Sequence, residues 1–223
     1  MAFLKSLKND SMAILEIGCG YTPICKGFPK FSSYLGIEPG SAPYSTVTQM
    51  AEEDERVSFR HGYLSEWAPE LGPSNFDAIV VTGVLHEVDD PESFLSSIGL
   101  LMKPGTRAYL NVPNSRSLHR LIGLASGHLQ DLETLSSRGQ DIEQREVYDL
   151  VKLENQIKAA IPRVEIESLG SFFLKPFTHR QMQFLIDNGE LDEKGVEGLY
   201  QVSENLPGLG AELFITFSLA EHG

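Results

Sequence analysis

From residue 12 onward, short apolar runs alternate with stretches of helical periodicity, and this alternation constrains the fold more than any other feature of the chain. Parallel strands need a crossover between them, so a repeated strand–helix–strand order predicts a mostly parallel sheet with helices on its faces. The apolar runs at 12–17 (MAILEI), 33–37 (SYLGI) and 76–82 (FDAIVVT) are predicted strands. The last is apolar at nearly every position, as a central parallel strand is.

The other predicted elements follow the same order. Further strands are predicted at 57–60, 107–112, 164–168 and 212–219, and helices at 147–161, 178–187 and 193–204. Asp90 is predicted to cap another helix, with Pro91 in its first turn and the breaker Lys103-Pro104-Gly105 after it. Only about a dozen residues separate Gly20 from Ser33, so the first helix must be short.

The stretch from residue 113 to 146 has no clean period and is too long for an ordinary loop, so we expect a helical insertion after the fifth strand. A length of 223 residues fits one domain. We therefore expect a single domain over 1–223, with its core at about 12–113 and 147–220 and a helical substrate lid at about 114–146.

Composition argues against several classes of partner. Thirty-one acidic against 18 basic residues give a net charge of −13, which argues against nucleic acid as the main partner. Apolar runs stay short of the roughly 18 residues of a membrane span, and the first residues do not resemble a signal peptide. Cys19 and Cys25 are the only cysteines and match no metal motif. We expect a cytoplasmic protein without a membrane partner or a metal, as a monomer or homodimer.

Two short motifs predict a nucleoside site. Gly18 and Gly20 follow the first strand, where glycines let the backbone turn sharply and approach a ligand. Pro23 stands at the third glycine position of a dinucleotide fingerprint and lacks the N–H that binds pyrophosphate, which favours a ligand without phosphates. Glu38 ends the second strand, where a carboxylate can accept hydrogen bonds from both ribose hydroxyls. The alternative is that Glu38 only caps the helix after Pro39-Gly40.

Over about residues 12–113, the chain resembles the class I S-adenosylmethionine-dependent methyltransferases. The resemblance rests on four motifs in the family's order: ExGxG at 16–20, the acidic end of the second strand, FDAIVVTGVLHEVDDPESFL and LLMKPG. The resemblance implies an α/β fold: a Rossmann-like, seven-stranded, mostly parallel sheet with an antiparallel last strand and helices on both faces. It also implies S-adenosyl-L-methionine as the cofactor.

The resemblance further implies which residues contact the cofactor. Gly18 and Gly20 would line its methionine part, with Glu16 near the amino group, and Glu38 would hold the ribose. Tyr63 stands where the family often has Asp, so stacking or hydrogen-bond donation replaces carboxylate recognition of adenine. The implied cofactor-binding residues are Glu16, Gly18, Cys19, Gly20, Glu38, Pro39, Gly62, Tyr63, Leu64, Thr82 and Gly83.

Methyl transfer from a sulfonium is an in-line displacement, and an alcohol acceptor must also lose its proton. His86 follows the fourth strand, at the end of the sheet that faces ligands, and is predicted to be catalytic. The alternative is a structural histidine bonded within its loop. Glu87 is predicted to bind substrate. A metal site is not predicted, because Asp90 is better explained as a helix cap.

A second polar cluster follows the fifth strand. If 115–124 is helical, Arg116 and Arg120 lie one turn apart on one face with His119, a second catalytic candidate, beside them. Such a group could capture a phosphate or carboxylate, and the alternative is a solvated helix face. Arg180 is expected to join from the last third of the chain. The predicted substrate-binding residues are Tyr21, Glu87, Asn111, Asn114, Arg116, Arg120 and Lys175.

Over about residues 106–182, the chain resembles methyltransferases of surface-polysaccharide and nucleotide-sugar pathways. This resemblance rests on three segments in the same order: LNVPNSRSLHRLIG, REVYDL and GSFFLKPFTHRQM. This resemblance implies an O-methyltransferase whose acceptor is a small polar, phosphate-bearing molecule, a sugar or nucleotide-linked sugar. The alternatives within the enzyme class are an N-methyltransferase and a quinone or phenol O-methyltransferase. Outside that class they are a nicotinamide-dependent oxidoreductase and a non-catalytic protein that binds a nucleoside cofactor.

Overall fold

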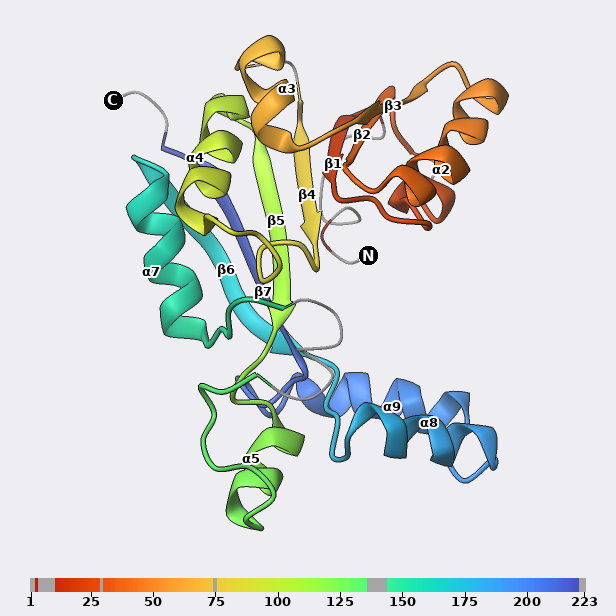
Figure 1. The fold of residues 1–223 in the computed structure, drawn as a ribbon, viewed down its shortest axis with the longest axis vertical. Helices are drawn as coiled ribbons and strands as arrows, with labels where there is room; N and C mark the ends of the chain where they lie inside the picture. Colours follow the sequence, from red (N-terminus) through yellow and green to blue (C-terminus); the bar gives the residue numbers. More distant parts are fainter. Residues whose placement is uncertain (1–2, 4–10, 29, 74–75, 136–143, 221–223) are drawn as a thin grey trace.

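The computed structural model describes residues 3, 11–28, 30–73, 76–135 and 144–220. They form a seven-stranded sheet of order β3-β2-β1-β4-β5-β7-β6 (Figure 1). Its first five strands are parallel, and β7 runs antiparallel to both β5 and β6. The strands are β1 (Ala13–Ile17), β2 (Ser33–Glu38), β3 (Val57–His61), β4 (Ala78–Thr82), β5 (Arg107–Pro113), β6 (Val164–Phe172) and β7 (Glu212–Leu219). The predicted fold class is confirmed.

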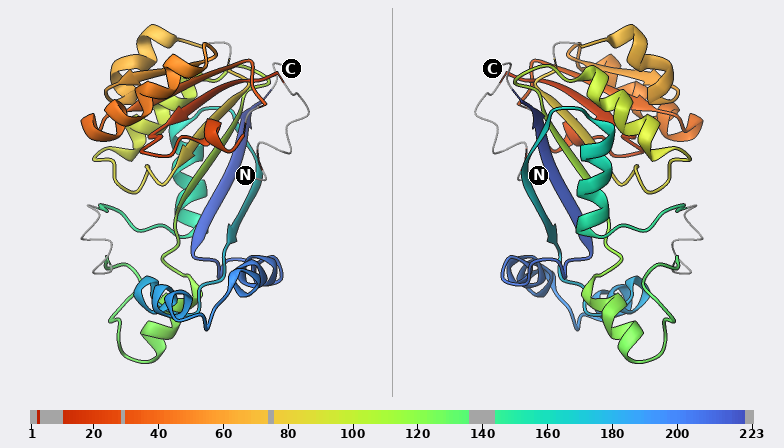
Figure 2. Two further views of the ribbon diagram at one scale, coloured as in Figure 1. Left: turned by 90° about the vertical axis from the view of Figure 1, so that its right-hand side faces the viewer. Right: turned by 90° about the vertical axis from the view of Figure 1, so that its left-hand side faces the viewer.

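Helices cover both faces of the sheet, as Figures 1 and 2 show. On one face α3 (Leu64–Leu71), α4 (Pro91–Leu101) and α7 (Leu150–Ala160) pack in a row, and their buried side chains form one core layer with the sheet. The other layer lies under the short 3₁₀ helix η1 (Ile24–Lys26) and α2 (Ser41–Glu53). The sheet is therefore buried on both sides, which explains why β1 and β4 are apolar along nearly their whole length.

Local signals set several element ends as predicted. The Asp90 carboxylate accepts a hydrogen bond from Ser93 N at 3.0 Å and caps α4, whose first residue is Pro91. Among the described residues of the short first crossover, only η1 is helical. Within the described part of the predicted insertion, only α5 (Leu118–Ala125) is helical, and residues 136–143 lie outside the described residues.

The fold places a ligand-binding edge at the carboxyl ends of β1, β4 and β5. The order of the strands reverses at β1, which lies between β2 and β4, and ligands of open α/β sheets bind at such a switch point. Beyond this end of the sheet lie α5 and the hairpin of α8 (His179–Asp187) and α9 (Glu193–Ser203), which is inserted between β6 and β7 (Figures 1 and 2). The site must therefore lie between the sheet and these helices.

Candidate active site

The glycine segment after β1 is a tight turn whose conformation requires glycine. Gly18 and Gly20 have φ of 73° and 55°, in the left-handed region. A Cβ on Gly18 would overlap Cγ2 of Val84 from the loop after β4, whereas a Cβ on Gly20 would meet open space. Gly18 therefore packs the turn against the β4 loop, and Gly20 leaves its outer side open to a ligand.

Glu38 is buried at the end of β2 and holds this turn in place. Its Oε2 accepts a hydrogen bond from Gly20 N at 2.8 Å, and its Oε1 accepts one from Gly40 N at 2.8 Å. A carboxylate has about four acceptor positions, so two remain for ribose hydroxyls. The capping interpretation and the ribose interpretation are therefore compatible, and the turn together with this carboxylate fits an adenosyl cofactor.

Glu16 has a structural environment. Its carboxylate is buried and accepts hydrogen bonds from the Tyr34 hydroxyl and from Ile24 N, at 2.9 Å for the latter, so it anchors the start of η1. Burial raises the pKa of Glu16 above its ordinary value. Cys19 is buried as well, and burial together with the charge of Glu16 raises the pKa of its thiol to about 12.

The residues expected around adenine lie at the edge of β2 and β3. Tyr63 is exposed, and its N–H donates to the Glu66 carboxylate at 2.6 Å, so the residue starts α3 and leaves its ring free to stack on a ligand. The carbonyl oxygen of Pro39 lies 3.2 Å from Nε2 of the His61 ring, within hydrogen-bond distance. Leu64 is buried in the core, so a cofactor can meet it only through its main chain.

A cleft of about 1140 Å³ lies at the carboxyl ends of β4 and β5. It brings together nine of the predicted site residues from four separate segments: Thr82, Gly83, His86, Glu87, Asn111, Asn114, His119, Arg120 and Lys175. Gly83 and His86 belong to the same loop as Val84, which touches Gly18 as described above. The glycine turn and the cleft are therefore adjacent, as a cofactor and its acceptor must be.

His86 is the most unusual side chain of the cleft. It is only 3% exposed, its Nε2 lies 3.5 Å from Oε1 of Glu87, and its Nδ1 has no hydrogen-bond partner among the described residues. A buried polar atom without a partner costs roughly 1–3 kcal/mol, which is uncommon in a purely structural residue. Burial lowers the pKa of His86 to about 4, so the ring is neutral near pH 7.

His119, on α5, also lines the cleft. Its Nδ1 is 3.1 Å from the Ser117 hydroxyl. Burial, followed by the charges of Lys175 and Arg120, lowers the pKa of His119 to about 3. The two cations are therefore close to this ring, and this wall of the cleft carries positive charge.

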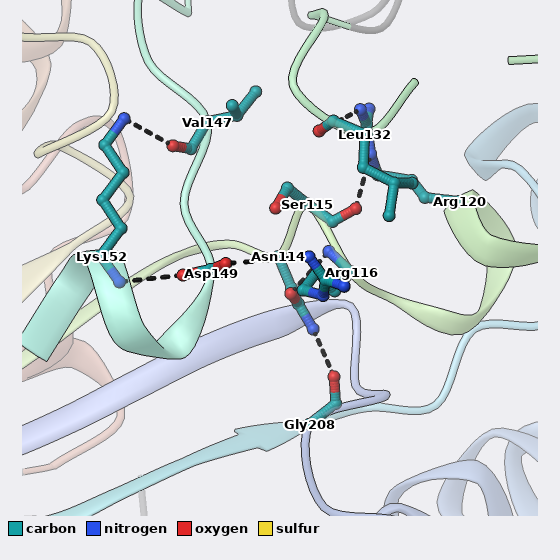
Figure 3. Close-up of polar contacts among 9 residues, drawn as sticks. All are labelled: Asn114, Ser115, Arg116, Arg120, Leu132, Val147, Asp149, Lys152 and Gly208. Atoms are coloured by element: carbon teal, nitrogen blue, oxygen red, sulfur yellow. Dashed lines mark hydrogen bonds and ion pairs between the residues drawn. The ribbon is translucent and has the colours of Figure 1, made fainter. Parts of the chain in front are cut away.

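The predicted pairing of Arg116 and Arg120 on one helical face is wrong. α5 begins only at Leu118, because Arg116 N donates to Oδ1 of Asn114 in the turn before it, and the Arg116 side chain lies 4.0 Å from Asp149 (Figure 3). Arg120 is buried and donates to the carbonyls of Ser115, Leu132 and Thr134. Arg120 thus fixes the segment after α5, and Arg116 does not line the cleft.

Asn114 also serves the framework, because its amide donates to the Gly208 carbonyl at 2.9 Å (Figure 3). It also donates to the Gly210 carbonyl at 2.7 Å, and so ties the end of β5 to the segment before β7. Tyr21 is exposed and does not line the cleft.

Sequence reasoning missed Glu212, whose carboxylate accepts a hydrogen bond from the Asn111 side-chain amide at 3.3 Å. Antiparallel pairing of β7 with β5 places the first residue of β7 beside the end of β5, which is the signal that could have found it. Arg180 lines the cleft, as expected from the sequence, and the residues of the cleft that were not predicted to bind substrate include His128, Gln144, Val147 and His179.

Within the described ranges, no group of three or more His, Cys, Asp or Glu side chains is arranged to hold a metal ion. Of the helices that the structure describes, none combines the length and the apolar character needed to cross a membrane.

A family model described as "Methyltransferase domain" matches residues 1–160. The chain belongs to this methyltransferase family. The expectation of a methyltransferase that uses S-adenosylmethionine is therefore confirmed at the level of the family. The match covers β1 to α7, which includes the glycine turn, Glu38 and the β4 loop with His86.

Similar proteins agree with this assignment. The ubiquinone biosynthesis O-methyltransferase of Maricaulis maris is 29% identical over 98 residues, which are 43% of this chain and 38% of that protein. The match thus spans less than half the length of that relative. Among solved structures, a S-adenosylmethionine-dependent methyltransferase from Mesorhizobium loti has a TM-score of 0.65 at 13% identity and covers 97% of this methyltransferase and 95% of its own chain. A second solved structure is phosphoethanolamine N-methyltransferase 2 of Haemonchus contortus in complex with phosphomonomethylethanolamine and S-adenosylhomocysteine. Its TM-score is 0.65 at 16% identity, and the match covers 99% of this chain and 52% of that chain.

Proposed function

We propose that this methyltransferase transfers a methyl group to a hydroxyl of a small polar acceptor, with His86 as the general base. The observation that carries the proposal is the buried His86 ring in a large cleft beside the glycine turn, with one ring nitrogen lacking a partner in the described structure. A ligand hydroxyl would supply that partner.

When bound, S-adenosylmethionine supplies an electrophilic methyl group on a sulfonium. Glu38 would accept hydrogen bonds from the ribose hydroxyls at its two remaining acceptor positions, and the turn at Gly18 and Gly20 would let the backbone approach the ligand. We assign the N–H of His86 to Nε2, which lies 3.5 Å from Oε1 of Glu87, so that Nδ1 would carry the lone pair that accepts the hydroxyl proton. Because Nδ1 is covered in this conformation, the ring or its neighbours shift slightly when the acceptor binds.

The walls of the cleft favour an acceptor with an anionic group. Lys175 and Arg180 line the cleft opposite the β4 loop, although the chain as a whole carries a charge of −13. A phosphate-bearing acceptor, with a sugar or nucleotide-linked sugar as one class, fits this charge. The related fold that holds phosphomonomethylethanolamine is consistent with a phosphate here. The segment 114–146 is proposed to form the acceptor-binding lid.

A quinone or phenol acceptor is the second candidate, because curated relatives of this methyltransferase are named ubiquinone biosynthesis O-methyltransferases. A phenol is far more acidic than a sugar hydroxyl. Deprotonation of a phenol therefore needs a weaker base, and the lowered pKa of His86 makes its ring a weak base.

The test is methyl transfer from S-adenosylmethionine to a panel of nucleotide sugars, phenols and amines, with wild type, His86→Ala and His86→Gln. We expect turnover on a hydroxyl acceptor to fall about 100-fold or more in both variants, because general base catalysis contributes about 10²–10⁴-fold. Cofactor affinity, measured by calorimetry with S-adenosylhomocysteine, should stay within twofold. Full turnover in both variants would remove His86 as the base, and activity on amines alone would replace the hydroxyl by an amine acceptor.

A further inference from the structure

We infer that Arg145 is a positioning residue for the reaction: it fixes the main chain of the β4 loop and thereby holds His86 in place. No comparison with a known protein assigns a role to this residue. The inference rests on the proposed function of His86, and its test below separates the two.

The main chain of Arg145 is bonded directly to the residue that carries the proposed base. Arg145 N donates to the His86 carbonyl at 2.8 Å, and Glu146 N donates to the same oxygen at 3.3 Å. Because both donors come from the segment before α7, residues almost 60 positions apart are joined at the cleft. The position of His86 therefore depends on a segment outside its own loop.

The side chain of Arg145 contacts the same loop at two further residues. Its Nε donates to the Glu87 carbonyl at 3.2 Å and forms an ion pair with Oδ1 of Asp89 at 3.0 Å. Main chain and side chain together thus bind three residues of one four-residue stretch, 86–89. We call this set of contacts the Arg145 clamp.

Within the loop itself, Gly83 N donates to the Asn111 carbonyl at 3.1 Å, Glu87 N donates to the Val84 carbonyl at 2.8 Å, and Asp90 caps α4. Between these points, the Arg145 clamp adds contacts to His86, Glu87 and Asp89. Gly83, with φ of 67°, gives the loop a pivot at its start. Without the clamp, His86 would sample orientations in which its ring no longer meets the acceptor.

The exposure of the ion pair decides which kind of effect to expect. The side chain of Arg145 is 51% exposed and that of Asp89 is 83% exposed, so their Coulomb attraction is screened by water and contributes little to global stability. A misplacement of about 1 Å in an active site, in contrast, can cost about 100-fold in rate. Removal of the guanidinium should therefore change turnover much more than it changes the melting temperature.

Arg145 is also distinct from an acceptor-binding cation. The cleft is lined by its neighbours Gln144 and Val147, but Arg145 is not among the lining residues. Loss of an acceptor contact raises KM, whereas loss of a positioning residue lowers kcat. The two roles therefore predict different kinetics.

The experiment compares Arg145→Ala, Arg145→Lys and the control Arg56→Ala. Arg56 makes the same kinds of contact elsewhere: its side chain pairs with Asp54 at 2.6 Å and donates to the Phe31 carbonyl at 3.1 Å. We expect Arg145→Ala to lower kcat about 10-fold or more with KM and S-adenosylhomocysteine affinity within twofold. Arg145→Lys keeps the charge and should recover part of the loss, and Arg56→Ala should leave kcat unchanged.

A second readout uses the protein without cofactor or acceptor. Amide hydrogen exchange over 83–90 should accelerate in Arg145→Ala, and the imidazole signals of His86 in NMR spectra should move, while neither changes in Arg56→Ala. Unchanged exchange and ring signals would overturn the inference, as would a rise in KM alone. If His86→Gln keeps full turnover, the base assignment fails, but exchange and ring signals still show whether the clamp orders the loop.

Discussion

At the scale of single residues, Glu38 offers the most direct test of the cofactor site. Glu38→Ala removes the carboxylate that accepts from Gly20 N and Gly40 N, so it loosens the glycine turn and also removes the proposed ribose contact. We expect calorimetry to show at least about 10-fold weaker binding of S-adenosylhomocysteine, since hydrogen bonds to a charged group contribute about 1.5–3 kcal/mol each. Glu38→Gln should lose less, because its amide oxygen still accepts one bond. Unchanged affinity in Glu38→Ala would remove the ribose assignment.

His86 and His119 make stability depend on pH. Both rings have pKa values below the ordinary value of 6.5, about 4 and about 3, because burial disfavours their charged forms. Between pH 6.5 and 4 the unfolded chain therefore binds more protons at these rings than the folded chain, so stability falls as pH falls. Each ring contributes up to about 1.4 kcal/mol per pH unit in that window.

The measurement is urea unfolding at pH 7.5 and pH 5.5 of wild type, His119→Gln and the control His128→Gln, in which the replaced residue is exposed. His119→Gln should lose less stability than wild type on acidification, and His128→Gln should behave like wild type. An equal loss in all three proteins would show that folding does not lower the pKa of His119.

At the scale of elements, the strands and the capped helix were predictable because their signals are local. The apolar run at 76–82 contains β4, and Asp90-Pro91 marks the first residues of α4. The start of α5 was not predictable. Ser117 and the Asn114 turn begin that helix at Leu118, and the Asn114 side chain in this turn is held by the carbonyls of Gly208 and Gly210 in the segment before β7.

The same distinction explains which site residues were found. The glycine motif and Glu38 lie at the ends of β1 and β2, so the local pattern together with the family resemblance could predict Gly18, Gly20 and Glu38 as candidates. The clamp by Arg145 and the place of Glu212 depend on contacts between segments almost 60 and about 100 residues apart, respectively, which no local pattern encodes. The burial that lowers the pKa of His86 likewise arises from packing of the whole edge of the sheet.

At the scale of the whole molecule, charge is distributed unevenly. The chain carries −13 in total, whereas the cleft contains Arg120, Lys175 and Arg180 against Glu87 and Glu212. The net field therefore repels anions at long range, while the cleft attracts them at short range. Added salt screens the long-range repulsion over about 10 Å at 0.1 M, so we infer that an anionic acceptor depends on short contacts within the cleft for its binding.

Binding of an adenosyl ligand should stabilise the whole domain, since the glycine turn joins β1, β2 and the β4 loop around the switch point of the sheet. A ligand at 100 times its Kd adds about 2.7 kcal/mol to the free energy of unfolding. We expect S-adenosylhomocysteine to raise the melting temperature in a thermal shift assay, NAD to leave it unchanged, and Glu38→Ala to lose most of the shift. Gly127→Ala, a change at a positive-φ glycine after α5 and away from the turn, lowers the starting melting temperature and should keep the shift. We expect no shift with NAD because Pro23 removes the N–H that a dinucleotide would use. A shift with NAD but none with S-adenosylhomocysteine would contradict the cofactor assignment.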